Sequence, residues 1–289
     1  MAQIKTVGFI GIGVMGRSMA GHLLDAGYEV LIYTRTKEKA DALIQKGAMW
    51  KSTVKDIAEA ADAVITMVGY PSDVEEIYLG EEGLVKHASP GTYLIDMTTS
   101  KPQLAKKIET KAKERGLFAL DAPVSGGDVG ARNGTLAIMI GGEKEAFEDC
   151  LPLFQQMGEN IQYQGAAGSG QHTKMCNQIA IAAGMIGVAE AMVYAKKSGL
   201  DPETVLKSIT TGAAGSWSLS NLAPRMLKGD FEPGFYVKHF IKDMGIALEE
   251  AKLMGEEMPG LSLAKSLYEK LAEDGEENSG TQSIYTLWD

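Results

Sequence analysis

The chain begins with an apolar run, a glycine turn, a helix-forming segment and a second apolar run. Val7–Ile10 leads directly into a Gly-x-Gly-x-x-Gly turn at positions 11 to 16. Arg17–Ala26 has helical character, and Glu29–Tyr33 is again apolar. A lone glycine pattern is weak evidence, because ordinary turns share it, but this strand–turn–helix–strand order is the context in which such a turn binds a dinucleotide. The segment therefore predicts the start of a nucleotide-binding α/β sheet.

The three glycines of this turn have separate physical roles. Gly11 permits the tight turn, Gly13 lets a pyrophosphate approach the backbone, and Gly16 lets the helix pack closely on the strand. The helix start then offers free N–H groups and a partial positive charge to the phosphates. The expected cofactor-binding residues of the turn are Gly11, Ile12, Gly13, Val14, Met15 and Gly16.

Apolar runs and helical patterns alternate through the first half of the chain. The expected strands are Val7–Ile10, Val30–Tyr33, Ala63–Met67, Tyr93–Met97, Phe118–Ala122 and Leu136–Ile140. The expected helices are Lys37–Lys46, Val54–Ala60, Pro102–Arg115 and Lys144–Met157. Alternating strands and helices of this kind build a doubly wound, mainly parallel sheet. The fold class is therefore α/β, with a Rossmann domain at residues 1–164.

The strand pattern ends near Tyr163, and only helical patterns follow. A glycine-rich break precedes one long apolar helix, His172–Ser198, and further helices are expected at Pro202–Thr210, Leu219–Lys228, Val237–Met254 and Leu261–Asp274. Residues 165–289 are thus expected to form an all-α domain, joined to the first by the long helix. Because that helix is apolar on nearly every side, we expect it to be buried, partly against another subunit of a homodimer or homotetramer.

Charge and composition exclude several classes of function. A net charge of −10 without a strong basic run argues against nucleic acid or an anionic membrane as a partner. The two cysteines, Cys150 and Cys176, favour a reducing, cytoplasmic location over a disulfide framework. The first strand begins without a cationic leader or apolar signal core, so secretion is not expected. The longest apolar stretch, Ile179–Ala195, contains Glu190 and is short for a membrane span.

The end of the second strand indicates the cofactor. In this fold an acidic residue about twenty positions after the glycines holds the ribose 2′-hydroxyl of NAD. Thr34 stands there instead, followed by Arg35, Thr36 and Lys37. A guanidinium grips a 2′-phosphate with two hydrogen bonds, whereas a carboxylate would repel it. We expect NADP(H) to be preferred, with NAD(H) second, and Arg35 and Thr36 to bind the cofactor. Alternatively, Arg35 is a solvated residue or stacks on the adenine.

Asp121–Gly127 follows an expected strand at its carboxyl end, where open α/β sheets bind their ligands. Ser125 offers a hydroxyl, and Gly126 and Gly127 expose backbone N–H groups. These groups are suited to holding the carboxylate of a small substrate. A plain turn is the alternative interpretation of this segment.

Two lysines lie in expected helices, and the helix of Lys174 is otherwise apolar. Lys174 and Asn177 are three positions apart and hence share one face at the start of the long helix. A desolvated lysine is suited to proton transfer, although an ammonium that reaches solvent is the simpler explanation. In the Lys242-Asp243 pair, Lys242 could reach a bound ligand and Asp243 could orient a neighbour, or the two could form an ordinary exposed ion pair.

No metal site is expected. The four histidines show no metal-ligand spacing; they are His22, His87, His172 and His239. The chain also lacks the Gly-x-Ser-x-Gly nucleophile elbow.

Together these segments resemble the β-hydroxyacid dehydrogenase family, which includes 3-hydroxyisobutyrate dehydrogenase, tartronate semialdehyde reductase and relatives of 6-phosphogluconate dehydrogenase. Phe9–Leu23 is similar to the family's cofactor signature and Asp121–Gly127 to its substrate-binding motif. Gly170–Asn177 is similar to the catalytic motif, and Lys242-Asp243 to the late active-site segment. The resemblance covers essentially the whole chain.

The resemblance implies roles for individual residues. Lys174 would be the general acid/base, Asn177 would orient the substrate, and Ser125, Gly126 and Gly127 would bind its carboxylate. The segment Asp96–Ser100 would lie near the nicotinamide, with Thr98 beside the substrate and Thr99 and Lys242 beside the cofactor.

The chain departs from the family pattern in three places. Gln178 stands where many members have a second Asn, although the tartronate semialdehyde reductase type also tolerates Gln there. Val68–Pro71 replaces a more usual Leu-Pro, and Thr34–Thr36 differs from NAD-type members, which have Asp before the Arg.

The predicted activity is hydride transfer between NADP(H) and a small semialdehyde or β-hydroxy acid. One alternative is a non-catalytic NADP-binding sensor or scaffold. Another is a decarboxylating dehydrogenase of the 6-phosphogluconate type, which needs a phosphate-binding Arg/His cluster of which only Arg225 stands out. A third, an imine reductase, is disfavoured by Lys174.

Overall fold

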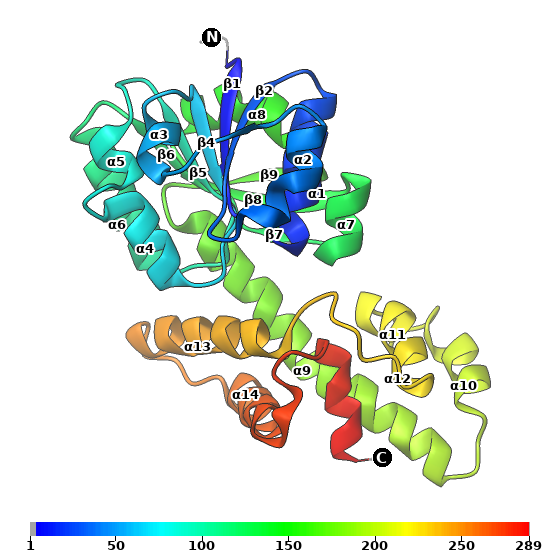
Figure 1. Cartoon of the computed structure of the whole chain (residues 1–289). Helices are drawn as coiled ribbons and strands as arrows, with labels where there is room; N and C mark the ends of the chain where they lie inside the picture. Colours follow the sequence, from blue (N-terminus) through cyan, green and yellow to red (C-terminus); the bar gives the residue numbers. More distant parts are fainter. Residues whose placement is uncertain (1–3, 289) are drawn as a thin grey trace. The chain divides into compact units, whose positions relative to one another are not determined.

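The computed structural model describes residues 4–288, and its first half is the expected mainly parallel sheet (Figure 1). The strands are β1 (Thr6–Ile10), β2 (Glu29–Tyr33), β3 (Met49–Trp50), β4 (Ala63–Thr66), β5 (Tyr93–Asp96), β6 (Phe118–Asp121), β7 (Val124–Ser125), β8 (Leu136–Gly142) and β9 (Gly158–Gly165). Their order is β3-β2-β1-β4-β5-β6-β8-β7, with β9 paired to β8. Only the pairs of β8 with β6 and β7 are antiparallel. The α/β fold is thus confirmed.

Helices cover both faces of this sheet. They are α1 (Val14–Asp25), η1 (Lys37–Ala40), α2 (Asp41–Gln45), α3 (Val54–Ala58), α4 (Pro71–Leu79), α5 (Leu84–His87), α6 (Pro102–Lys113), α7 (Gly127–Asn133) and α8 (Lys144–Phe154). Successive β1 side chains point to opposite faces. Val7 and Phe9 join a core with α1, α2, α7 and α8, while Ile10 joins a second core with α3 to α6. The doubly wound arrangement follows from this alternation.

Some expected elements differ in detail. The helix expected at Lys37–Lys46 is divided into η1 and α2, and Lys144–Met157 ends earlier, at Phe154. Sequence patterns did not predict β3, β7 or β9. The two residues of β3 and of β7 are too few to show a period, and β9 alternates only weakly, with exposed or partly exposed residues along most of its length.

The second half of the chain is all-helical. Its elements are α9 (Ser169–Lys197), α10 (Pro202–Ile209), α11 (Trp217–Asn221), α12 (Ala223–Leu227), α13 (Val237–Leu253), α14 (Pro259–Leu271), η2 (Ala272–Glu276) and η3 (Thr281–Leu287). Phe240 of α13 and Tyr268 of α14 are fully buried, with ring centroids 5.0 Å apart. Together with α9 these helices build a separate apolar core.

The chain divides into two compact units at Lys174/Met175, inside α9. The first turns of α9 belong to the sheet unit, because Asp121 at the end of β6 accepts hydrogen bonds from the backbone of Gly168 and Gln171. The expected domain boundary at 164/165 lies just before these contacts.

The helix α9 is not covered on every side within the described chain. Its exposed stripe is made mostly of small residues and consists of Cys176, Ala180, Ala183, Gly184, Gly187, Glu190 and Tyr194. By length and composition alone, α9 is apolar enough to cross a membrane, a test that the core helix of a soluble protein also passes.

Candidate active site

The glycine turn between β1 and α1 has the geometry that a dinucleotide requires. Gly11 has a φ of 101°, its N–H donates to Tyr33 O at 2.9 Å, and a Cβ there would lie 2.2 Å from Met67 O. A Cβ on Gly16 would lie 1.9 Å from Gly11 O. Neither position accommodates a side chain, so the turn and the helix pack as the sequence predicts.

Gly13, unlike Gly11 and Gly16, has open space where a side chain would stand. It precedes α1 as its N-cap, no side chain caps the helix, and a Cβ would meet nothing within 4 Å. The neighbouring Val14 side chain is exposed, whereas Ile12 is buried. The open space in front of the N–H groups at the helix start fits a pyrophosphate. The residues present therefore fit a bound dinucleotide.

Arg35 and Thr36 are exposed directly after β2. The Arg35 guanidinium is 78% exposed and its Nη1 lies 3.2 Å from Asp73 Oδ1 in α4. Asp73 also caps α4, since its Oδ2 accepts a hydrogen bond from Tyr70 N at 3.1 Å. Arg35 is thus exposed but ion-paired, and an anionic ligand would compete with the Asp73 carboxylate for its guanidinium.

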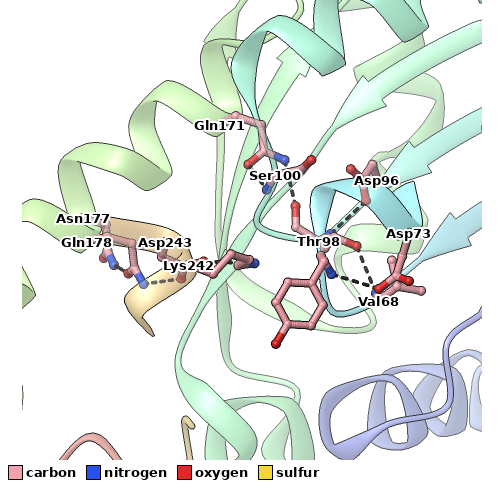
Figure 2. Close-up of polar contacts among 11 residues, drawn as sticks. Val68, Asp73, Asp96, Thr98, Ser100, Gln171, Asn177, Gln178, Lys242 and Asp243 are labelled. Carbon is pink, nitrogen blue, oxygen red and sulfur yellow. Dashed lines mark hydrogen bonds and ion pairs between the residues drawn. The ribbon is translucent and has the colours of Figure 1, made fainter. Parts of the chain in front are cut away.

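A buried hydrogen-bond network organises the loop after β5 (Figure 2). Asp96 Oδ1 accepts from Thr66 Oγ1 at 2.9 Å and from Thr98 N at 3.0 Å. Thr98 Oγ1 in turn accepts from Val68 N at 3.0 Å. Burial raises the pKa of Asp96 to about 6. Thr98, expected beside the substrate, is buried and joins the loops that follow β4 and β5, while Thr99 is only partly buried.

The start of α9 is attached to the same loop and to β6. Gln171 Nε2 donates to Thr98 O at 2.7 Å, and its Oε1 accepts from Ser100 N at 2.9 Å (Figure 2). Asp121 accepts from Gly168 N at 2.7 Å and Gln171 N at 2.8 Å, and burial raises its pKa to about 6. Lys174 lies one turn beyond Gln171 and is 7% exposed. The attachment fixes where the lysine-bearing turn stands relative to the sheet.

Ser125 ends β7, and Gly126 and Gly127 lead into α7. Gly126 has a φ of 133°, which favours glycine, and a Cβ on Gly127 would meet nothing within 4 Å. The segment is therefore a strand-to-helix turn with open space at Gly127. The structure places all three residues in one short turn at the sheet, as their adjacency requires.

The remaining predicted residues belong to the helical unit. Asn177 Nδ2 donates to Gln178 Oε1 at 2.7 Å, and Gln178 Nε2 donates to Asp243 Oδ2 at 2.6 Å. Lys242 Nζ lies 3.0 Å from Asp243 Oδ1, with both side chains largely buried. The Lys242–Asp243 pair is thus not an ordinary exposed ion pair. Figure 2 shows these four residues in one chain of contacts.

Two family models match the chain. Residues 6–165 match the NAD binding domain of 6-phosphogluconate dehydrogenase, and residues 168–288 match the NAD-binding domain of NADP-dependent 3-hydroxyisobutyrate dehydrogenase. The chain belongs to the β-hydroxyacid dehydrogenase family. The expected resemblance is confirmed across both halves of the chain.

Individual relatives agree. An uncharacterized oxidoreductase of Bacillus subtilis, YkwC, is 79% identical, with 98% of this chain and 99% of the relative covered. An NAD-dependent L-serine dehydrogenase of Pseudomonas aeruginosa is 38% identical, with coverages of 99% and 98%. The structure of a Mycobacterium tuberculosis 3-hydroxyisobutyrate dehydrogenase with L-serine superposes with a TM-score of 0.90 at 30% identity, covering 99% of each chain. This family member is thus an NAD(P)-dependent β-hydroxyacid dehydrogenase.

Sequence reasoning missed two residues that organise the site. Gln171 and Asp96 were not singled out, although both are buried and polar. A carboxylate at the end of an apolar strand was an available signal for Asp96. For Gln171 no such signal exists, because its two partners lie more than seventy positions away in the chain.

Proposed function

We propose that this enzyme prefers NADP(H) and reversibly reduces a small semialdehyde to the corresponding β-hydroxy acid, with Lys174 as the general acid/base. The bound nicotinamide supplies or accepts the hydride. Lys174 gives a proton to the carbonyl oxygen in reduction and takes it back in oxidation. The observation that carries this proposal is the burial of Lys174 on a helix turn that Gln171 attaches to the loop of Thr98 and that Asp121 attaches to the end of β6.

The other residues bind and orient. Ser125, Gly126 and Gly127 hold the substrate carboxylate, and Asn177 positions the reacting end. Thr98 and Thr99 lie beside the substrate and the nicotinamide, and Lys242 lies near the cofactor. Holding the carbonyl in one orientation converts an encounter into a nearly unimolecular step, which lowers the entropic part of the barrier.

The end of β2 supports the preference for NADP(H), because Thr34 stands where NAD-type members carry an acid, and Arg35 and Thr36 follow it. The exposure of the Arg35 guanidinium leaves it accessible to a 2′-phosphate. The family model matched by the second half is of an NADP-dependent dehydrogenase, whereas the Pseudomonas relative is NAD-dependent. Dissociation constants for NADPH and NADH test the proposed preference.

We also propose that the protein is a cytoplasmic homodimer or homotetramer. Both cysteines are free, which suits a reducing compartment. The small-residue stripe on α9 is the surface that another subunit would cover. The molar mass of the protein in solution tests this proposal, and a monomer would contradict it.

A substrate panel tests the proposed activity. Succinic, tartronate and methylmalonate semialdehydes and glyoxylate would be offered with NADPH and NADH, and L-serine and 3-hydroxyisobutyrate with NADP and NAD, with turnover followed by nicotinamide absorbance. We expect turnover with at least one small carboxylate-bearing substrate and a higher kcat/KM with NADP(H). Cofactor binding without turnover of any substrate would instead indicate a sensor or scaffold.

A further inference from the structure

Three side chains in the helical unit form a hydrogen-bonded row, the relay, in which the donor and the acceptor of each bond are identified. The row begins at Asp243 of α13, continues through Gln178 and ends at Asn177, both of α9 (Figure 2). Asp243 and Gln178 are each 1% exposed. Buried polar groups of this kind are costly unless their hydrogen bonds are made, so each member constrains the next.

The carboxylate of Asp243 decides the orientation of the Gln178 side-chain amide. An aspartate that forms an ion pair with Lys242 only accepts hydrogen bonds, so Gln178 must turn its NH2 group towards Asp243 Oδ2, at 2.6 Å. The amide carbonyl of Gln178 consequently faces the other way. It meets Asn177, whose side chain must then present its own NH2 group, at 2.7 Å.

We propose that Asp243 is a positioning residue that acts through Gln178 to fix which way round the amide of Asn177 stands. One N–H of the Asn177 amide is committed to Gln178. The carbonyl oxygen, on the other side of the amide, is thereby turned away from the relay, where it can accept from an O–H or N–H donor. The inference rests on the proposed function in one respect, namely that Asn177 orients the substrate. It adds that Asn177 does so as a hydrogen-bond acceptor and that a carboxylate two contacts away enforces this.

The relay is tested by exchanging the carboxylate of Asp243 and the carboxamide of Gln178 between their two positions. In Asp243→Asn the side chain at 243 can offer either its oxygen or its NH2 group, so Gln178 is no longer oriented. In Gln178→Glu two carboxylates face each other. In the double variant, Asn at 243 donates to Glu at 178, whose carboxylate accepts from Asn177. The double variant therefore restores the orientation of Asn177 and keeps the charge of the cluster unchanged.

We expect each single variant to lower kcat/KM for the substrate by about tenfold or more, and the double variant to recover to within about threefold of the wild type, because contacting residues couple in this way. Asp230→Asn is the matched control: it removes a carboxylate that pairs with Arg225 in the same unit at 2.7 Å, and should alter stability but not kcat. Losses that simply multiply in the double variant would overturn the proposal.

A readout independent of turnover separates the relay from the activity. In protein with 15N-labelled Asn, the Asn177 side-chain NH2 signals, assigned by their loss in Asn177→Asp, should shift in Asp243→Asn and return in the double variant. Signals that stay unchanged in Asp243→Asn would refute the relay. If the wild type transfers hydride to no substrate, the proposed function fails, and these signals alone decide whether the relay exists.

Discussion

Gln171 and Thr98 are joined by a hydrogen bond of 2.7 Å from the side-chain amide of Gln171 to the carbonyl oxygen of Thr98. The same amide accepts from Ser100 N, so one buried side chain connects the start of α9 to the loop after β5. The turn that carries Lys174 is thereby held to the loop expected beside the nicotinamide. This relationship makes Gln171 a positioning residue.

Replacing Gln171 should weaken the attachment of the loop after β5 to the start of α9. Gln171→Glu loses the donor to Thr98 O but keeps an acceptor for Ser100 N, whereas Gln171→Leu loses both. Each buried backbone group left without a partner costs about 1–3 kcal/mol. We expect the Leu variant to lose more stability and more kcat than the Glu variant. Gln156→Leu is the control, because the side-chain amide of Gln156 also donates a hydrogen bond to a backbone carbonyl, Pro152 O, but in an exposed position. Equal urea midpoints and kcat values in all variants would contradict the positioning role.

Lys174→Ala should lower kcat by about 10²–10⁴-fold, the range typical of one acid/base group. Cofactor affinity, measured by fluorescence titration, should largely persist, because the glycine turn is unaffected. Lys107→Ala provides a control, since Lys107 forms an exposed ion pair with Glu75. Turnover by Lys174→Ala at the wild-type rate would remove the lysine from the mechanism.

Arg35→Ala should weaken NADPH binding by about tenfold or more, while NADH binding changes little, because a charge-assisted contact to the 2′-phosphate is lost. Asp73 competes with that phosphate for the guanidinium. Asp73→Asn should therefore tighten NADPH binding and leave NADH binding unchanged, with Asn still able to accept from Tyr70 N. Dissociation constants for both cofactors provide the measurement. Equal effects of Arg35→Ala on the two cofactors would exclude a phosphate contact.

Gly13→Ala should separate cofactor binding from folding. A Cβ at this position meets nothing within 4 Å, so the free energy of unfolding should change by about 1 kcal/mol or less. The same methyl group would occupy the space in front of the helix start, and the cofactor Kd should rise by more than tenfold if the pyrophosphate binds there. Gly260→Ala, whose Cβ would make only an ordinary contact of 3.8 Å with Ala183 Cβ, should leave cofactor affinity unchanged. Unaltered NADPH affinity in Gly13→Ala would contradict this placement of the pyrophosphate.

Asp96→Asn should alter how stability depends on pH. Burial raises the pKa of Asp96 from 3.8 to about 6 in the folded protein. A raised folded pKa means that the contribution of this group to stability is fully present below pH 4 and is lost as the pH rises through about 6. Asn cannot titrate, and its oxygen can accept both bonds that Asp96 Oδ1 accepts. Between pH 4 and 7 the variant should gain about 1–3 kcal/mol relative to the wild type. The free energies of unfolding of the variant and the wild type would be measured with urea across this pH range. A difference between them that does not change with pH would contradict the raised pKa.

The sequence by itself determined the fold class and the family. Apolar period and glycine spacing are local signals, so β1 and the glycine turn were predicted closely, and the end of α1 to within one residue. The start of α1, at Val14, lies three residues before the expected Arg17, inside the glycine turn. The motifs around Ser125 and Lys174 were recognised for the same reason, since the residues that define each are close in the chain. Short or exposed strands such as β3 and β9 carry too weak a local pattern and were missed.

Only the tertiary structure decided which distant groups meet. It paired Arg35 with Asp73, Gln171 with Thr98 and Gln178 with Asp243, over separations of 38, 73 and 65 positions. A hydrogen bond between side chains leaves no periodic trace in the sequence, because its energy depends on distance and direction in space alone. The sequence suggested that Asp243 could orient a neighbour, but the partners of Asp243 and Gln171 were visible only after folding had brought them together.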